Sequence, residues 1–345
     1  DAGAVVPRRF LTVLSSDPPR AFTQGSGRLE LARAMVTDGA PLTSPNFNGA
    51  HLSIPAQSIV TGENVVTMAF IARIAAAGAS IIRYRDATDG AEYLYTLLVP
   101  ADANQLFPCF DQPDLKARVS LRLRAPANWR VLANGPERSS GAADGGQSAE
   151  HEFAETEPIS TYLIAFAAGP WTTVTSRSSK RPITMYVRKS RAAEAEGDSI
   201  IVANDVAARW LEGYFARPFP FKKLDVLLAP AFPFGGMEHP GAIFYNEDRF
   251  IFRERPTLTQ RLGRTATIYH EVAHHWFGDY VTMKWFDDLW LKEGFATYMA
   301  AKMQAVEAAA KPANSPGAVN PWMSFYLRNK PAAYDVDQTL GTTPV

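Results

Sequence analysis

Several features that mark other classes of protein are scarce in this chain of 345 residues. It has one cysteine, Cys109, so no disulfide can form within the chain, and the expected role of this thiol is that of a small buried apolar group. Neither sign of charge dominates, because 35 Lys and Arg residues balance 35 Asp and Glu residues. This balance provides no electrostatic reason to expect nucleic acid or an anionic membrane as a partner.

Long apolar runs are missing as well. The longest ones, such as residues 162–171, are far shorter than the roughly 18–20 residues that a membrane-spanning helix needs. No leader segment is visible, and the chain starts at Asp1 and stops at Val345. We therefore expect a processed or partial chain, and its compartment stays open between the cytoplasm and, if a leader has been removed, the periplasm or the exterior of the cell. Nothing in the sequence indicates an oligomeric state.

The first half of the chain has the two-residue period of β-strands. Val119, Leu121 and Leu123 alternate with polar residues, as in a strand that is buried on one face. Residues 139–148 are rich in Gly, Ser and Ala and are expected to form a flexible turn between two strands, while residues 160–167 form an apolar run of strand length. No long helical period is found before residue 190. We predict an antiparallel β-sheet domain over residues 1–172.

The second half, residues 173–345, changes to a helical period. Apolar residues recur at intervals of three and four between Ile200 and Tyr214, which predicts an amphipathic helix. Residues 224–228 and 242–245 are typical of buried strands. A mixed α/β domain over these residues makes the fold class α+β.

Two further helices are predicted from their first residues. Thr257 and Gln260 have the spacing of a capping box, which indicates a helix that continues through Val272. Asp287 and Asp288 are expected to cap another helix, which runs to about residue 303.

The most informative segment is His-Glu-Val-Ala-His at residues 270–274. On a helix, His270 and His274 lie on one face about one turn apart, so both imidazoles can reach one Zn²⁺ ion. Glu271 can then take a proton from a water bound to the metal. A catalytic zinc needs a third protein ligand and one open position, and Glu293 on the next predicted helix offers that ligand. The alternative is a helix with ordinary, partly buried histidines.

A second motif, Gly-Gly-Met-Glu-His, occupies residues 235–239. The glycines Gly235 and Gly236 suit a strand edge where another backbone comes close, and a substrate peptide could lie along Met237. Glu238 would then present a negative charge to a cationic group of that peptide. The alternative is a turn between two strands with a solvated glutamate.

These motifs together resemble the aminopeptidase N-like family of zinc metallopeptidases, the gluzincins with a thermolysin-like catalytic domain. The matching segments are FPCFDQPDLK at residues 107–116, GGMEH at 235–239, HEVAHHWFGD at 270–279 and WFDDLWLKEGFATY at 285–298. The 18 residues between His274 and Glu293 also match the family spacing. The resemblance, to a bacterial-type variant truncated at its C-terminus, implies a saddle-like antiparallel β domain followed by a thermolysin-like α/β domain.

Carried over by position, the resemblance implies roles for individual residues. His270, His274 and Glu293 match the ligands of one Zn²⁺ per chain, and Glu271 matches the general base. Glu238 matches the glutamate that binds the free α-amino group of a peptide substrate. The strand residues before it, Gly235, Gly236 and Met237, match the segment that lines the first residue of the substrate.

The chain departs from the family pattern at several positions. His239 and Lys292 each stand where asparagine is common, and His275 stands where glutamine is common. A second amine-binding Glu or Gln is absent, because Val99 occupies its position, so amine recognition depends more heavily on Glu238. The tyrosine that stabilises the oxyanion in the family is expected to lie beyond residue 345.

The sequence therefore predicts a zinc-dependent aminopeptidase that removes the N-terminal residue of peptides, with peptides bearing a free N-terminus as partners. Two alternatives remain open. The chain could be a thermolysin-like endopeptidase, in which residues 235–238 are merely an edge strand. It could also be a catalytically weak, zinc-bound fragment that binds peptides, because loss of an oxyanion donor typically costs about a hundredfold to a thousandfold in rate.

Overall fold

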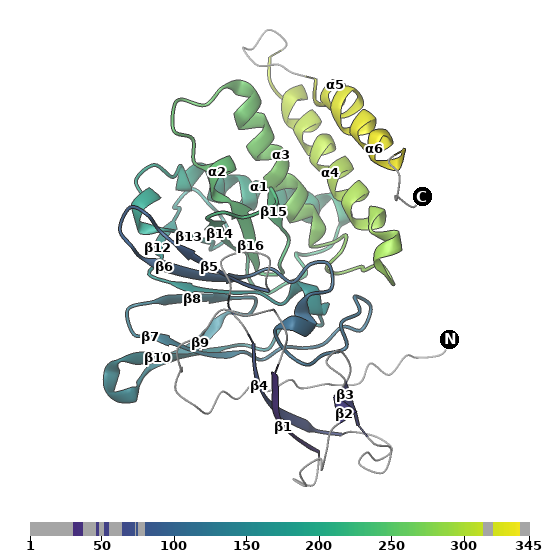
Figure 1. The fold of residues 1–345 in the computed structure, drawn as a ribbon. Coiled ribbons are helices and arrows are strands. Elements are labelled where there is room, and N and C mark those ends of the chain that lie inside the picture. Colours follow the sequence, from purple (N-terminus) through teal and green to yellow (C-terminus); the bar gives the residue numbers. More distant parts are fainter. Residues whose placement is uncertain are drawn as a thin grey trace. The chain divides into compact units, whose positions relative to one another are not determined.

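The computed structural model describes residues 30–36, 46–47, 52–54, 64–72, 74, 80–312 and 320–338. The chain divides into two compact units, Asp1–Pro170 and Trp171–Val345, which are described separately (Figure 1). Strands dominate the described part of the first unit, and a mixed sheet with helices forms the second. This order confirms the predicted succession of an antiparallel β-sheet domain and a mixed α/β domain.

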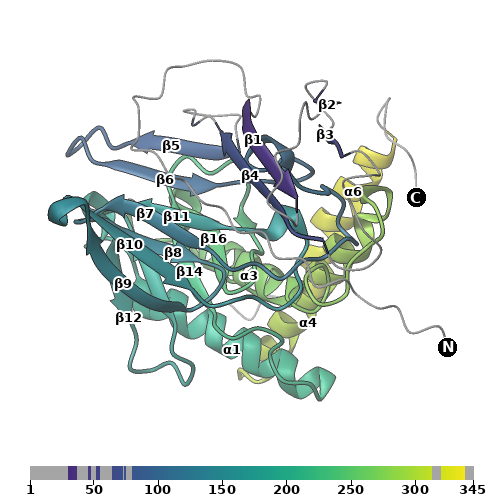
Figure 2. The ribbon, with the colours of Figure 1, turned by 90° about the horizontal axis from the view of Figure 1, so that it is seen from below.

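The first unit contains antiparallel sheets (Figure 2). The largest has the strand order β5–β6–β11–β8, and a second sheet has the order β7–β10–β9. Two strand pairs, β1–β4 and β2–β3, complete the described part of this unit. The bounds of these strands are β1 Glu30–Val36, β2 Asn46–Phe47, β3 Leu52–Ser53, β4 Val66–Ile71, β5 Ile81–Arg85, β6 Glu92–Thr96, β7 Arg122–Pro126, β8 Arg130–Ala133, β9 Glu137–Ala143, β10 Ser148–Phe153 and β11 Phe166–Gly169.

The alternation around Leu123 indicated β7 correctly, but two other segments of this unit differ from the prediction. Residues 139–148 are not simply a flexible turn, because the first half of them, residues 139–143, belongs to β9, an exposed edge strand paired along β10. The side chains of an exposed edge strand need not alternate between apolar and polar. The sequence of β9 therefore lacks the two-residue period by which strands are predicted. Residues 160–167 are mostly not a strand either. Thr161–Leu163 form a buried 3₁₀ turn, and β11 starts only at Phe166, so the apolar run reflects burial.

Cys109 in this unit is half-buried. Burial, with a smaller contribution from the nearby Asp111 carboxylate, raises the pKa of its thiol. A thiol that stays protonated behaves as the small, unreactive apolar group that the sequence predicts.

The second unit is built on a five-stranded mixed sheet with the order β12–β13–β14–β16–β15. The central pairs β13–β14 and β14–β16 are parallel, whereas β12 and β15 run antiparallel to their neighbours at the two edges. The strand bounds are β12 Thr172–Thr175, β13 Thr184–Val187, β14 Asp225–Ala229, β15 Gly236–Met237 and β16 Ala242–Asn246. The second motif of the sequence thus forms an edge strand, as its paired glycines indicated.

Helices complete this unit (Figure 1). Their bounds are α1 Gly197–Phe215, α2 Glu247–Phe250, α3 Leu258–His274, α4 Trp290–Ala309, α5 Pro321–Ser324 and α6 Lys330–Asp337, with one π-helical turn, Phe325–Asn329, between the last two. The core lies between the sheet and helices α1, α3 and α4. Buried apolar residues of this core include Leu211 of α1, Val226 of β14, Val272 of α3 and Met299 of α4. No helix in the described ranges combines the length and the apolar character of a membrane span.

Helix α3 begins as the sequence predicts. The Thr257 hydroxyl accepts a hydrogen bond from the Gln260 backbone amide, and the Gln260 side chain accepts one from the Thr257 amide. Helix α4 begins differently, because Asp287 and Asp288 belong to a 3₁₀ turn and Leu289 stands at its N-cap. It also continues to Ala309, beyond the predicted end, since residues 300–309 are mostly strong helix formers.

Candidate functional site

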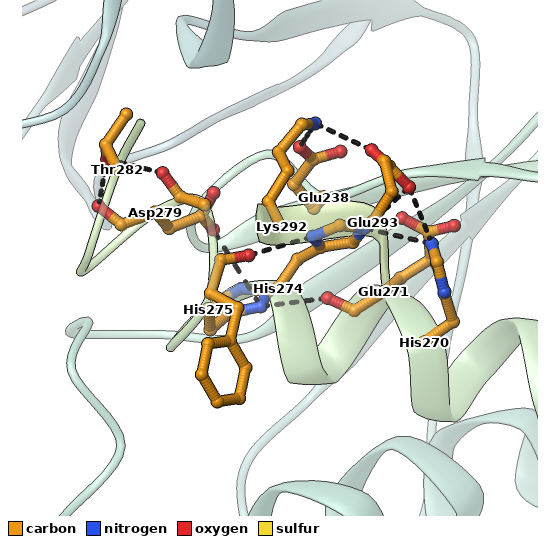
Figure 3. A network of polar contacts seen from close by, with 11 residues as sticks. Glu238, His270, Glu271, His274, His275, Asp279, Thr282, Lys292 and Glu293 are labelled. Carbon is orange, nitrogen blue, oxygen red and sulfur yellow. Dashed lines mark hydrogen bonds and ion pairs between the residues drawn. The ribbon is translucent and has the colours of Figure 1, made fainter. Parts of the chain in front are cut away.

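Two neighbouring helices bring the predicted metal ligands together. His270 and His274 lie one turn apart on α3, and Glu293 lies in the first turn of α4 (Figure 3). On the opposite face of α3, Ile268, Val272 and Ala273 pack into the core and so fix how the helix is rotated. The histidines therefore project toward α4 because the apolar residues between them are held by the core.

Three side-chain atoms converge in this arrangement. His270 Nε2 lies 2.9 Å from His274 Nε2, and Glu293 Oε2 lies 3.2 Å from the first of these atoms and 3.4 Å from the second. Atoms bound about 2.0–2.1 Å from a tetrahedral Zn²⁺ ion lie about 3.3 Å apart. The spacing of the three atoms is thus close to that required by one small divalent cation.

The outer nitrogens of both imidazoles are also occupied. His274 Nδ1 is 2.9 Å from the carbonyl oxygen of Phe277, which can only accept a hydrogen bond. His270 Nδ1 is 3.2 Å from the Thr297 hydroxyl. The Phe277 carbonyl favours the tautomer in which His274 Nδ1 carries the proton and Nε2 offers its lone pair, and the Thr297 hydroxyl can accept from His270 Nδ1 in the same way. The donor set of two imidazoles and a carboxylate therefore fits a metal ion of the zinc type.

Glu271 faces the same space from α3 (Figure 3). Its carboxylate packs against the backbone of β15, since a Cβ atom on Gly236 would come within 2.5 Å of Glu271 Oε1. One of its oxygens lies within 4.8 Å of ligand atoms of both His274 and Glu238. Burial, reinforced by the charges of Glu238 and Glu293, raises the pKa of Glu271 to about 8. Because Gly236 has no side chain, it leaves room for the Glu271 carboxylate at the edge of the sheet.

Glu238 is buried beside this group and forms an ion pair with Lys292, the residue that precedes Glu293 on α4. The Lys292 ammonium donates a hydrogen bond to Glu238 Oε1 and lies 3.0 Å from Glu293 Oε1. Burial opposes ionisation of Glu238, but the charges of Lys292 and His274 outweigh it and lower its pKa to about 2. Glu238 is therefore a buried carboxylate and not the solvated glutamate of a turn.

The charges of the cluster act on the histidines too. Burial alone would lower the pKa of His274, yet Glu238 and Glu293 raise it to about 9. Burial lowers the pKa of His270, with a further contribution from the adjacent His274. The carboxylates of Glu238 and Glu293 thus create a site that attracts positive charge, whether a proton or a metal ion.

Two more histidines of the motifs are buried away from the three converging atoms. The His275 ring packs between Phe219 and Phe221, and its Nδ1 donates toward the Glu271 carbonyl oxygen at 3.2 Å. The His239 ring packs edge-on against Phe244. Burial lowers the pKa of His275 to about 3 and that of His239 to about 4, so both are neutral. These contacts are those of core residues.

The structure brings Glu238, His270, Glu271, His274 and Glu293 together, and Gly236 lies against Glu271, whereas Gly235 lies against Arg249 and Thr267. Met237 is buried in β15, directly before Glu238 in the chain. Sequence reasoning gave no role to Lys292, Thr297 or Gly278. Gly278 adopts φ = +121°, and a Cβ atom there would lie 3.1 Å from Lys292 Cδ. The signal for Lys292 was its position next to a predicted ligand, but only the folded chain shows which carboxylates it contacts.

Comparison with known proteins places this site in a family. Residues 41–163 match the model of the peptidase M1 N-terminal domain, and residues 203–345 match that of the peptidase family M1 domain. The second match contains all the residues of the cluster. Two histidines and a glutamate that converge on one point have the composition of the zinc ligand set of one class of metallopeptidases. The chain belongs to peptidase family M1 and is an aminopeptidase N-like member of it.

Several named relatives support this membership. The chain is 34% identical over 307 residues to aminopeptidase N of Streptomyces lividans, a match that covers 88% of this chain and 34% of the relative. It is 37% identical over 217 residues to probable aminopeptidase 1 of Sulfurisphaera tokodaii, covering 62% of this chain and 27% of the relative. Mouse glutamyl aminopeptidase is 35% identical over 201 residues, with 58% and 21% covered. The chain spans about a third or less of the length of these relatives.

Proposed function

We propose that the chain forms the metal-binding and amine-binding part of a zinc-dependent aminopeptidase, with a thermolysin-like second unit. The observation that carries this proposal is the convergence of two kinds of group in one cluster. His270, His274 and Glu293 suit a metal ion, and Glu238 places a second carboxylate beside them, with oxygen atoms within 4.8 Å of His274 and Glu271. The relatives named aminopeptidases support the same activity.

Each group of the cluster has a distinct task in this proposal. A Zn²⁺ ion held by the three ligands would supply Lewis acidity toward water and toward the scissile carbonyl group. Glu271 accepts a proton from the attacking water and passes it to the leaving amine, which is the work of a general acid and base. The substrate backbone lies along β15, the edge strand of the sheet, where its amide groups can pair with the strand.

Glu238 sets the position of cleavage. Its buried carboxylate accepts hydrogen bonds from the substrate α-ammonium group and so fixes the scissile bond one residue from the N-terminus. A charge-assisted hydrogen bond of this kind contributes about 1.5–3 kcal/mol, which corresponds to a preference of roughly tenfold to a hundredfold for a free N-terminus. The departure at Val99 leaves this task mainly to Glu238.

Replacing Glu238 with glutamine should reduce hydrolysis of peptides with a free N-terminus and spare peptides whose N-terminus is acetylated. We expect kcat/KM for an aminoacyl nitroanilide to fall by about tenfold to a hundredfold, because the neutral amide attracts an ammonium group much less than a carboxylate does. The measurement compares steady-state kinetics on the free and the acetylated substrate. Glu254→Gln, which removes an exposed carboxylate of the same unit, is the matched control.

Equal losses on both substrates, or no loss on either, would show that Glu238 does not measure the N-terminus. If the unmodified protein rapidly cleaves a peptide that is blocked at both ends, the endopeptidase alternative would be favoured instead. Stoichiometric zinc without turnover of either substrate would favour a module that only binds peptides.

A further inference from the structure

Lys292 is a buried lysine that lies among the carboxylates of the site. Only 3% of the residue is exposed, and its ammonium group contacts two carboxylates from different elements. It donates a hydrogen bond to Glu238 Oε1 and lies 3.0 Å from Glu293 Oε1 (Figure 3). A lysine is rarely buried in this way unless its charge is paired, so the two carboxylates account for its position.

The surrounding chain holds this side chain in place. Lys292 lies in the first turn of α4, next to the Glu293 ligand. The methylene groups of Lys292 pack against Gly278, where a Cβ atom would come within 3.1 Å of Lys292 Cδ and 3.3 Å of its Cβ. The absence of a side chain at Gly278 therefore leaves room for the lysine side chain that contacts Glu238.

This contact places a cation on the group that the substrate amine is proposed to use. Oε1 of Glu238 is already engaged by Lys292, so an α-ammonium group must share the same carboxylate. The formal charges lead to the same conclusion. With a divalent metal bound and all three carboxylates ionised, the metal and Lys292 together balance the charges of Glu238, Glu271 and Glu293 before any substrate arrives.

We propose that Lys292 is a specificity-determining residue that weakens the preference of the site for a free N-terminus, by holding one oxygen of Glu238 and opposing the substrate ammonium group. This inference rests on the proposed function, because it requires Glu238 to be the amine-binding group. Lys292 acts on the substrate through Glu238 and through its fixed charge. It takes no part in proton transfer.

Calorimetric binding to the zinc-loaded protein tests the idea without turnover. The probes are leucinamide, which carries an ammonium group, and 4-methylpentanamide, which has the same skeleton without it. We expect Lys292→Gln to bind leucinamide about tenfold more tightly than the unmodified protein does, and to bind 4-methylpentanamide with unchanged affinity. Like charges about 5 Å apart in a partly shielded site can alter affinity by up to about a hundredfold, and lost hydrogen bonds offset part of this.

Two further variants separate charge from general disturbance. Lys292→Arg keeps the positive charge and should resemble the unmodified protein, and Lys284→Gln, which removes an exposed lysine before α4, should also leave both affinities unchanged. Zinc content is measured for every variant, so that a change in metal loading is not mistaken for a change in amine binding. If Lys292→Gln binds leucinamide no more tightly, or tightens both probes alike, the proposal is wrong.

Glutamine retains donors for the two carboxylates, so we expect the variant to fold. If it does not, the unmodified protein alone provides the test. Because of Lys292, the unmodified protein should prefer leucinamide over 4-methylpentanamide by less than about thirtyfold. A larger ratio would overturn the inference about Lys292 while leaving Glu238 in its role. No preference at all would instead remove the basis of the proposed function, so the two failures are distinguishable.

Discussion

Replacing Glu271 with glutamine should lower kcat about a thousandfold while the protein keeps its metal ion. The substitution preserves the size of the side chain and its packing against Gly236, but the amide cannot accept a proton. Loss of a general base typically costs about a hundredfold to ten-thousandfold in rate. The measurement combines steady-state kinetics on an aminoacyl nitroanilide with metal analysis of the same preparation.

Metal content makes this prediction specific to proton transfer. Glu271 is not one of the three proposed ligands, His270, His274 and Glu293. Zinc should therefore remain at one equivalent per chain in the Glu271→Gln variant. A Glu271→Gln variant with kcat within tenfold of the unmodified protein would contradict the role of general base. A variant that has lost its zinc would show that Glu271 supports metal binding.

Removal of the metal ion is expected to abolish hydrolysis, and one equivalent of Zn²⁺ should restore it. The three ligands and the outer contacts to Phe277 and Thr297 suit a single ion, so chelation by a strong aminopolycarboxylate followed by dialysis should reduce turnover below detection. Activity is followed during titration with zinc, and the break point gives the stoichiometry. The His274→Ala variant, which lacks a ligand, should not recover at the same zinc concentration.

Hydrolysis that persists after complete chelation would mean that the cluster does not carry the reaction. Recovery that needs two equivalents of zinc would point to a second ion.

The two histidines of the site were predictable from sequence because their relative position is fixed by local rules. A spacing of four residues places His270 and His274 on one helix face whatever the rest of the fold does. The capping box at Thr257 marks where that helix begins. Glu293 required the further assumption that α4 returns beside α3, and this assumption depended on family resemblance as much as on spacing.

Other features depended on contacts between distant segments. The strand β9 has no apolar face, so only its hydrogen bonds to β10 show that it is a strand. The pairing of Lys292 with Glu238 joins residues 54 positions apart, and no pattern along the chain predicts it. Charge alone would have favoured an exposed lysine, since most lysines are exposed. Lys292 is buried instead, because the carboxylates of Glu238 and Glu293 pair with its charge.

The central claim is that His270, His274 and Glu293 hold one divalent cation. X-ray absorption at the zinc edge tests it most directly on protein loaded with one equivalent of Zn²⁺. We expect four or five light-atom ligands, two of them imidazole nitrogens at about 2.0–2.1 Å. A spectrum with one imidazole or none, or one that stays the same in the His274→Ala variant, would contradict this assignment.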